Sequence, residues 1–156
     1  MQQLDVDLRI ASIRSVLATD GVVSALATLN DKTEYRYTGL FKLRGAGMCA
    51  IFLFDRATEL RPRQRVTPLR TSVWRRMLQD GEFMTNSASE DSRLSPHDRT
   101  GSLESCFGRL LQPVAGTVPC GVLIHFDVER RNIDPAEALI LRTAAPLFLS
   151  YLNWSE

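Results

Sequence analysis

Two hydrophobic stretches in the last third of the chain, over residues 105–111 and 120–127, are separated by a more polar stretch centred on Gly116. The second stretch is almost continuously apolar from Val122 to Phe126, which is typical of a central strand covered on both faces. Two such runs joined by a turn that contains glycine predict a buried antiparallel hairpin. The other elements are then expected to cover both faces of a sheet built on this hairpin.

Both ends of the chain show the spacing of amphipathic helices. After the hairpin, Asp134 followed by Pro135 and Glu137 is the signature of a helix N-terminus, and apolar residues then recur at helical spacing. Near the N-terminus, the pattern predicts one helix that ends at residues 20–21 and a second from Val22 to about Asn30. The apolar stripe of the first helix is expected to consist of Leu4, Leu8, Ile13, Val16 and Leu17.

The middle of the chain alternates between strand-like and irregular segments. Residues 35–43 alternate between apolar and polar side chains, and residues 48–54 are apolar throughout, so they predict a second hairpin. A short helix is expected over 71–80, a short strand over 83–85 and a long loop over 86–101. This order predicts an α+β sandwich, in which a central antiparallel sheet of five to six strands has the terminal helices on one face and loops with short helices on the other.

Composition places this fold in one globular domain. The chain has 156 residues, of which 44% are hydrophobic, and this length leaves room for a single core. The net charge of +1 provides no overall field for nucleic acid or an anionic membrane. The N-terminus has no apolar signal region, and no stretch reaches the roughly 20 apolar residues of a membrane span. We therefore expect a cytoplasmic protein with no nucleic-acid or membrane partner.

One pair of residues suggests chemistry. If the hairpin turn is symmetric about residues 115–116, Cys106 lies opposite His125 on the same face of the sheet. A thiol beside an imidazole is a nucleophile with its base, so a thiol-dependent enzyme that uses these two residues is one alternative function. The favoured interpretation is a reduced, inert core cysteine near a packed histidine, because no third residue orients the pair. Cys49 and Cys120 also lie in apolar runs and are expected to be reduced.

Two charged segments admit a binding role or an ordinary one. Residues 56–76 carry seven arginines and one acid, which fits either an anion site or a solvated loop, and the solvated loop is favoured. His97 lies near Glu90, Asp91 and Asp98, but without the tight spacing of metal ligands, and turn capping explains these residues equally well. Since the sequence also contains no classical enzyme or nucleotide-loop motif, no metal or cofactor is expected.

At the level of families, the run from Gly121 to Asp127, with the helix that follows, resembles the closing segment of GAF domains, the small sensory domains of bacterial signalling proteins. Residues 35–43 resemble the first GAF strand, 51–56 the second, 91–97 the loop segment and 105–111 the penultimate strand. The resemblance implies a single GAF-like domain over the whole chain. Its parts are a helical region at about 4–30 and a core at 35–152.

The resemblance also implies a function. A GAF domain of this kind acts in signal transduction as a non-enzymatic sensor that holds a small molecule between the sheet and the loop at 86–101. The Asn-Lys motif of cyclic-nucleotide-binding GAF domains is absent, as is the loop cysteine of bilin-binding ones. Sulfoxide reductases of the family use cysteines around the pocket loop, and none lies between Arg56 and Ser105. The expected ligand-binding residues, polar groups in an aromatic cleft, are Tyr37, Phe41, Trp74, Arg93, His97, Ser105 and His125.

The terminal helices carry more apolar residues than one sheet is expected to cover. This surplus predicts a homodimer through the terminal helices, while the alternative is that the helices wrap the edge of their own sheet. Because the chain contains no output domain, a signalling output protein is expected on a separate chain. A structural dimerisation module without ligand remains the other functional alternative. The residues assigned to the dimer are Leu4, Val6, Ile10, Leu141, Leu147, Phe148, Tyr151 and Trp154.

Overall fold

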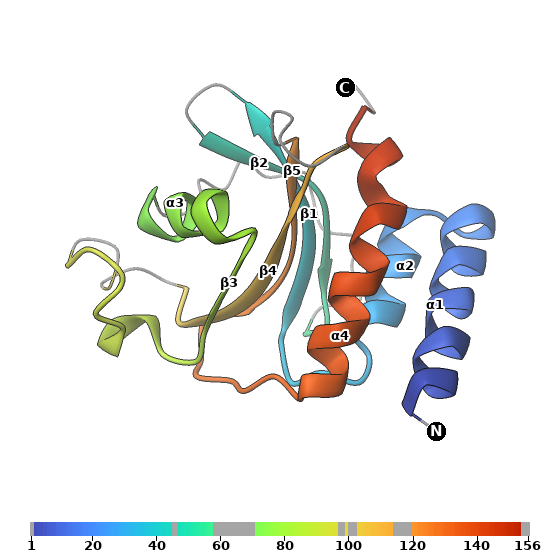
Figure 1. The fold of residues 1–156 in the computed structure, drawn as a ribbon, viewed down its shortest axis with the longest axis horizontal. Coiled ribbons are helices and arrows are strands. Elements are labelled where there is room, and N and C mark those ends of the chain that lie inside the picture. Colours follow the sequence, from blue (N-terminus) through green and yellow to red (C-terminus); the bar gives the residue numbers. More distant parts are fainter. Residues whose placement is uncertain are drawn as a thin grey trace.

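A computed structural model of the chain describes residues 2–44, 47–57, 71–96, 99, 103–113 and 120–153. Within them, five antiparallel strands form one sheet in the order β2-β1-β5-β4-β3 (Figure 1). The strands are β1 (Tyr37–Arg44), β2 (Gly47–Asp55), β3 (Glu82–Thr85), β4 (Ser105–Leu111) and β5 (Gly121–Asp127). The helices are α1 (Gln2–Thr19), α2 (Val22–Asn30), α3 (Thr71–Asp80), η1 (Ala88–Glu90), α4 (Pro135–Ala144) and η3 (Ala145–Asn153).

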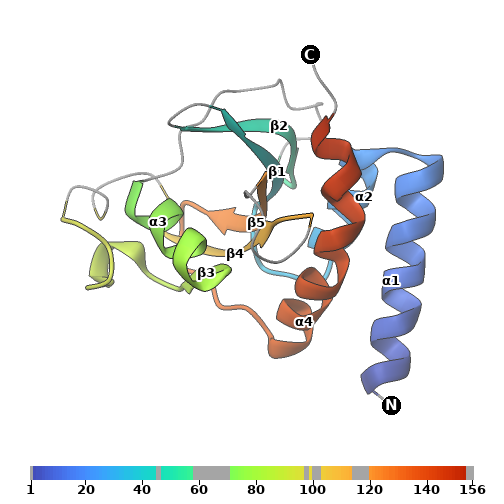
Figure 2. The same ribbon diagram turned by 45° about the horizontal axis from the view of Figure 1, so that its top comes forward.

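The sheet is covered on both faces, as the sequence predicts. Helices α2 and α4, together with η3, lie against one face, and α3 lies on the other (Figures 1 and 2). Helix α1 packs on α2 and α4 and forms the outermost layer of the molecule. The predicted α+β architecture, with terminal helices on one face and a short helix on the other, is therefore confirmed. We call the two sides of the sheet the helical face and the α3 face.

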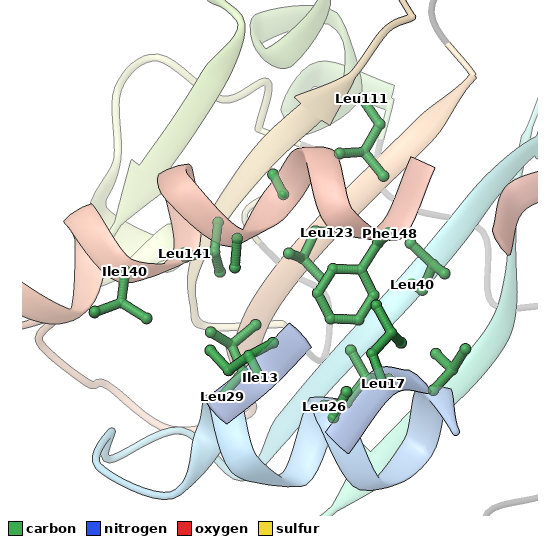
Figure 3. Packing of buried hydrophobic residues seen from close by; sticks show 14 of the residues in the cluster. Ile13, Leu17, Leu26, Leu29, Leu40, Leu111, Leu123, Ile140, Leu141 and Phe148 are labelled. Carbon is green, nitrogen blue, oxygen red and sulfur yellow. The ribbon is translucent and has the colours of Figure 1, made fainter. Parts of the chain in front are cut away.

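The helical face carries the larger of the two hydrophobic clusters. Leu26 and Leu29 of α2 meet Leu123 of β5 and Phe148 of η3, and all four side chains are fully buried (Figure 3). Burying a side chain of this size contributes about 1.5–3 kcal/mol relative to leaving it in water. This cluster therefore supplies much of the stability that holds the terminal helices to the sheet.

The predicted stripe of α1 is partly wrong. Ile13 and Leu17 are buried as expected, but Leu4 and Leu8 are 63% and 62% exposed. The residues that complete the buried stripe are Val6 and Ile10. Positions 6, 10, 13 and 17 recur every three or four residues and so form one face of a helix, whereas positions 4 and 8 fall on the opposite side.

The residues assigned to a dimer are mostly used inside the chain. Val6, Ile10, Leu141 and Phe148 all belong to the core of the helical face. Leu147 and Tyr151 are half-buried and pack against the same core, so these helices wrap their own sheet to a large extent. Leu4 is the one exposed member of the set among the described residues. The homodimer itself stays a prediction, and most of the residues assigned to its interface are not available to a partner.

The hairpin of β4 and β5 exists, but its predicted register is wrong by one residue. Cys106 pairs with Phe126, and His125 pairs with Phe107. The pairs are centred on Gly116, half a residue beyond the predicted centre. Because side chains alternate along a strand, this shift places Cys106 on the α3 face and His125 on the helical face. The two side chains therefore do not form a catalytic pair.

Candidate functional site

A row of aromatic side chains lies on the α3 face of the sheet, at one end of β1 and β5. Tyr37 and Phe126 are cross-strand partners, and their rings stack with centroids 4.8 Å apart and planes 16° apart. Phe41 meets Phe126 edge to face, with centroids 6.0 Å apart. The guanidinium carbon of Arg36 lies 4.9 Å from the centroid of the Tyr37 ring. Alternation along the strands brings these rings to one face, and the pairing of β1 with β5 brings them together.

Gly39 makes room for this row. It lies between Tyr37 and Phe41 in β1, and a Cβ atom at this position would come within 2.8 Å of the Phe41 ring and 3.2 Å of Leu53. No real Cβ atom sits that close to a ring carbon, so a side chain here would displace the Phe41 ring. The glycine is therefore part of what shapes the aromatic surface.

The charge at the end of the row is held in place by carboxylates. Arg36 donates from Nε and Nη2 to the two carboxylate oxygens of Asp55, at 2.8 and 3.1 Å, and this hydrogen bonding raises the pKa of Arg36. Its backbone N–H donates to Asp127, which also accepts from Arg131. Burial raises the pKa of Asp127, but the hydrogen bonds from Arg131 and two backbone N–H groups outweigh it and lower the pKa overall. The site thus holds fixed, fully ionised groups.

A surface depression of about 590 Å³ opens beside this end of the sheet. It contains three arginines, Arg36, Arg56 and Arg131. Arg56, an exposed residue, donates from Nη2 to the backbone carbonyl of Asn30 at the end of α2. The depression meets the aromatic row at Arg36, so aromatic surface and cationic groups adjoin there. Its full lining is Thr33, Glu34, Arg36, Arg56, Ala57, Asp127, Glu129 and Arg131.

Arg93 holds the segment after β3 against the α3 face of the sheet. This residue pairs with both oxygens of Asp91 at 2.9 and 2.6 Å and donates to the Met84 carbonyl at 2.7 Å. Its guanidinium carbon lies 4.5 Å from the Phe83 ring centroid, and the ion pair holds the pKa of Asp91 far below its usual range. Leu94 is buried in the cluster of the α3 face, so the segment up to Pro96 forms part of the wall of this side.

The predicted ligand-binding residues divide between the two faces. Tyr37, Phe41 and Trp74 lie on the α3 face, where Trp74 is half-buried against the cluster. Arg93 lies on the same side, in the segment just described. Ser105 and His125 point to the helical face, where Ser105 donates to the Glu129 carbonyl at 2.7 Å. Sequence reasoning missed Arg36 and Phe126; alternation along β5 gives the face of Phe126, but only the pairing of β1 with β5 makes it the partner of Tyr37.

Some predictions fall on parts of the chain outside the described residues. His97 and Asp98 are among them, as are the hairpin turn at 114–119, Trp154, and residues 58–70 of the arginine-rich segment. Within the described part, no group of three or more histidine, cysteine or acidic side chains is arranged to hold a metal ion. The helices described are all too short or too polar to cross a membrane.

His125 belongs to a buried polar cluster on the helical face. Its Nδ1 lies 2.6 Å from Thr38 Oγ1, which accepts a hydrogen bond from Asn30 Nδ2 at 2.9 Å. The Tyr35 and His125 rings stack with centroids 5.5 Å apart. Burial, with smaller contributions from nearby arginines, lowers the pKa of His125 to about 3, so the ring is neutral at physiological pH. This cluster joins α2 to the sheet.

Cys106 is buried among apolar side chains on the α3 face. Burial raises the pKa of its thiol to about 12, so almost no thiolate exists at neutral pH. His125 lies on the other face of the sheet, so it is not a base for this thiol. The arrangement is that of an inert core cysteine.

The known proteins that resemble this chain resemble it in structure. No family model matches the sequence, and no curated protein matches it. The GAF domain of a phosphoenolpyruvate-protein phosphotransferase from Acinetobacter is similar with a TM-score of 0.70 and 13% identity, over 97% of this chain and 93% of that one. A putative GAF sensor protein from Burkholderia vietnamiensis has a TM-score of 0.68 and 10% identity, over 96% and 94%.

A third similar structure is an enzyme. The free methionine-R-sulfoxide reductase from Neisseria meningitidis, in complex with its substrate, has a TM-score of 0.66 and 14% identity, over 95% of this chain and 90% of that one. Sensor domains and an enzyme thus share this architecture, and identities of 10–14% establish the fold alone. The antiparallel sheet, its cover on both faces and these near-complete similarities show that the chain has the GAF-domain fold.

Proposed function

We propose that the chain is a non-enzymatic sensory domain in signal transduction that binds a small molecule between the sheet and the segment at 86–101. The observation that carries this proposal is the aromatic row of Tyr37, Phe126 and Phe41 with Arg36 at its end. Tyr37 and Phe126 are only half-buried, so each residue has surface that a further group can contact. Apolar surface with a few fixed polar groups is the usual composition of a small-molecule site.

The chemistry of the site favours a planar, anionic ligand. Aromatic rings offer their faces to a planar ring by stacking, which contributes about 0.5–1.5 kcal/mol for each pair beyond burial. Arg36 and Arg131 are already paired with carboxylates, whereas Arg56 donates to backbone carbonyls, so Arg56 is the guanidinium that we propose to match carboxylate or phosphate oxygens of the ligand. An aromatic acid or a nucleotide combines both features, and these two classes are the first to test.

The test is a thermal-shift screen of the purified protein against nucleotides, amino acids and aromatic acids, preceded by native mass spectrometry to detect a ligand that copurifies. A ligand that binds only the folded state raises Tm with its concentration. Tyr37→Leu and Phe126→Leu are expected to abolish the shift, while Leu139→Ala, a change at an exposed site on α4, keeps it. If no compound in the screen raises Tm and no ligand copurifies, the result would count against a sensor and favour a structural module.

One observation favours the enzyme alternative: free methionine-R-sulfoxide reductases are among the structures with this fold. A thiol reaction at Cys106 needs an accessible thiolate and a base, and Cys106 is buried, has a raised pKa and is separated from His125 by the sheet. We therefore expect no turnover of free methionine-R-sulfoxide with a dithiol reductant. Alkylation of Cys106 by iodoacetamide should also be slow in the folded protein. Fast alkylation together with turnover would replace the sensor by an enzyme.

A sensory domain passes the presence of its ligand on to an output, and one route to that output is a partner chain. We propose that a separate signalling protein is that partner, and that the terminal helices are the elements that contact other chains. The outer position of α1 supports this part of the proposal.

A further inference from the structure

Helix α1 presents a second, mainly apolar stripe to the outside of the molecule. Its buried side packs on α2 and α4, and its outer side lies away from the rest of the described chain (Figures 1 and 2). Two leucines on that side are more than 60% exposed, which is unusual for large apolar residues that follow each other on one helix face. The outer stripe, all of it exposed, consists of Leu4, Leu8, Ala11, Ser15 and Ala18.

The spacing of this stripe is that of a coiled coil. Its members follow one another at intervals of four, three, four and three residues, which gives the 3.5-residue repeat that keeps one seam facing a second helix. Positions beside the seam are polar, with Asp7 and Arg14 on one side and Asp5 and Ser12 on the other, all exposed. Any single face of an α-helix recurs at such intervals, so the feature that distinguishes this face is its two exposed leucines flanked by polar side chains.

We propose that the outer stripe of α1 pairs with the same stripe of a second copy of this chain, in antiparallel orientation. In that orientation Leu8 faces Ala11 of the partner subunit, and Leu4 faces Ser15 of the partner subunit. Each layer then combines one large and one small side chain, which lets the two helices pack at an even distance. A parallel pair would instead place leucine against leucine at one end and alanine against alanine further along.

Charge complementarity supports the same orientation and a second copy as the occupant. The antiparallel pairing brings Asp7 beside Arg14 of the partner subunit, and symmetry repeats this contact at the other end of the seam. Arg14 is exposed and has no carboxylate partner among the described residues, and Asp7 accepts one hydrogen bond from Gln3. Two opposite-charge contacts therefore form without breaking an ion pair that the chain already uses.

The first test is the mass in solution, measured by light scattering at micromolar concentration. We expect twice the chain mass of 17.5 kDa, and a single chain mass for Leu4→Glu and Leu8→Glu. The matched control is Leu139→Glu, which changes an exposed leucine of α4 and should leave the dimer intact. Circular dichroism melts verify that all variants fold. A monomeric native protein, or a dimer that tolerates Leu8→Glu, overturns the proposal.

Two further measurements address the orientation. The single changes Asp7→Arg and Arg14→Asp should weaken the dimer, and the double variant should restore it. Cysteine cross-linking should join Leu4→Cys in one copy to Ser15→Cys in another, above the background given by the native protein. Efficient cross-linking of Leu4→Cys to itself would overturn the antiparallel arrangement. These results do not depend on the ligand screen, so failure of the proposed sensor function and failure of this dimer are separate outcomes.

Discussion

The imidazole Nδ1 of His125 lies 2.6 Å from the hydroxyl oxygen of Thr38, and the two residues are cross-strand partners in the buried interior of the helical face. Asn30 Nδ2 donates to the Tyr35 carbonyl at 3.0 Å and to Thr38 Oγ1, which fixes the orientation of the amide. The Thr38 hydroxyl is thus the hydrogen-bond partner of Nδ1, whereas Nε2 is buried and has no hydrogen-bond partner within the described part of the chain.

This buried ring predicts how stability depends on pH. Its folded pKa of about 3 lies below the ordinary value of 6.5, so the unfolded chain takes up a proton that the folded chain refuses. The free energy of unfolding therefore falls as the pH drops from 6.5 towards 3, by up to about 1.4 kcal/mol per pH unit. His125→Gln removes this contribution. Urea titrations between pH 7 and 4.5, above the range of most carboxylates, should show a steeper loss for the native protein; equal slopes would contradict the buried neutral ring.

The two hydroxyl groups of the cluster should respond differently to removal. Thr38→Val removes the hydroxyl that both Asn30 and His125 contact. It should lower the free energy of unfolding by about 1–3 kcal/mol, because two buried polar groups then lose a hydrogen-bond partner. The Tyr35 hydroxyl has no hydrogen-bond partner within the described part of the chain. Tyr35→Phe should therefore change the free energy of unfolding by less than about 0.5 kcal/mol, or raise it. A large loss for Tyr35→Phe would reveal a partner for that hydroxyl, such as an internal water.

Local signals in the sequence predicted the elements better than the relations between them. The N-cap of α4 was predictable because Asp134 acts on its own helix, and its carboxylate does accept from the Ala136 N–H. The α1 stripe was not, because both 6–10–13–17 and 4–8–11–15 have helical spacing, and only the packing of α1 on α2 and α4 decides which is buried. Periodicity shows which residues share a face of a helix, but it does not show which face packs against the rest of the protein.

The candidate site shows the same division. Tyr37 and Phe41 could be placed on one face from alternation within β1 alone. Cys106 and His125 could not be placed relative to each other, because the register between β4 and β5 depends on a turn whose centre the sequence leaves free by one residue. A slip of one residue exchanges the faces of every side chain in a strand. The predicted pairing of Cys106 with His125 is the part that depended on that register, and it is wrong.

Two strand glycines form a matched pair for testing how tightly the sheet is packed. A Cβ atom at Gly121 would lie 2.1 Å from the Phe41 carbonyl oxygen and 3.0 Å from Leu152, whereas one at Gly47 would meet nothing within 4 Å. A backbone oxygen cannot turn away like a side chain, so Gly121→Ala should lower the free energy of unfolding by about 3 kcal/mol or prevent folding. Gly47→Ala should be neutral or stabilising by a few tenths of a kcal/mol, since it restricts the unfolded chain. Comparable losses at both positions in thermal melts would contradict this account of β5 packing against β1.

The ion pair between Arg9 of α1 and Glu137 of α4 should show an asymmetric cost when it is broken. Arg9 donates from both terminal guanidinium nitrogens to the two carboxylate oxygens, and the side chains are only 15% and 10% exposed. Removing one partner from a buried pair leaves an uncompensated charge, which costs about 3 kcal/mol or more, while replacing both by apolar residues is often neutral. Arg9 also lines an open depression between α1 and α2, so its long side chain can turn to water when Glu137 is lost. Arg9→Met should therefore cost more than Glu137→Leu, and the double variant should recover most of the native stability. A double-mutant cycle of urea midpoints measures this, and additive losses would show that the pair contributes nothing to holding α1 against the domain.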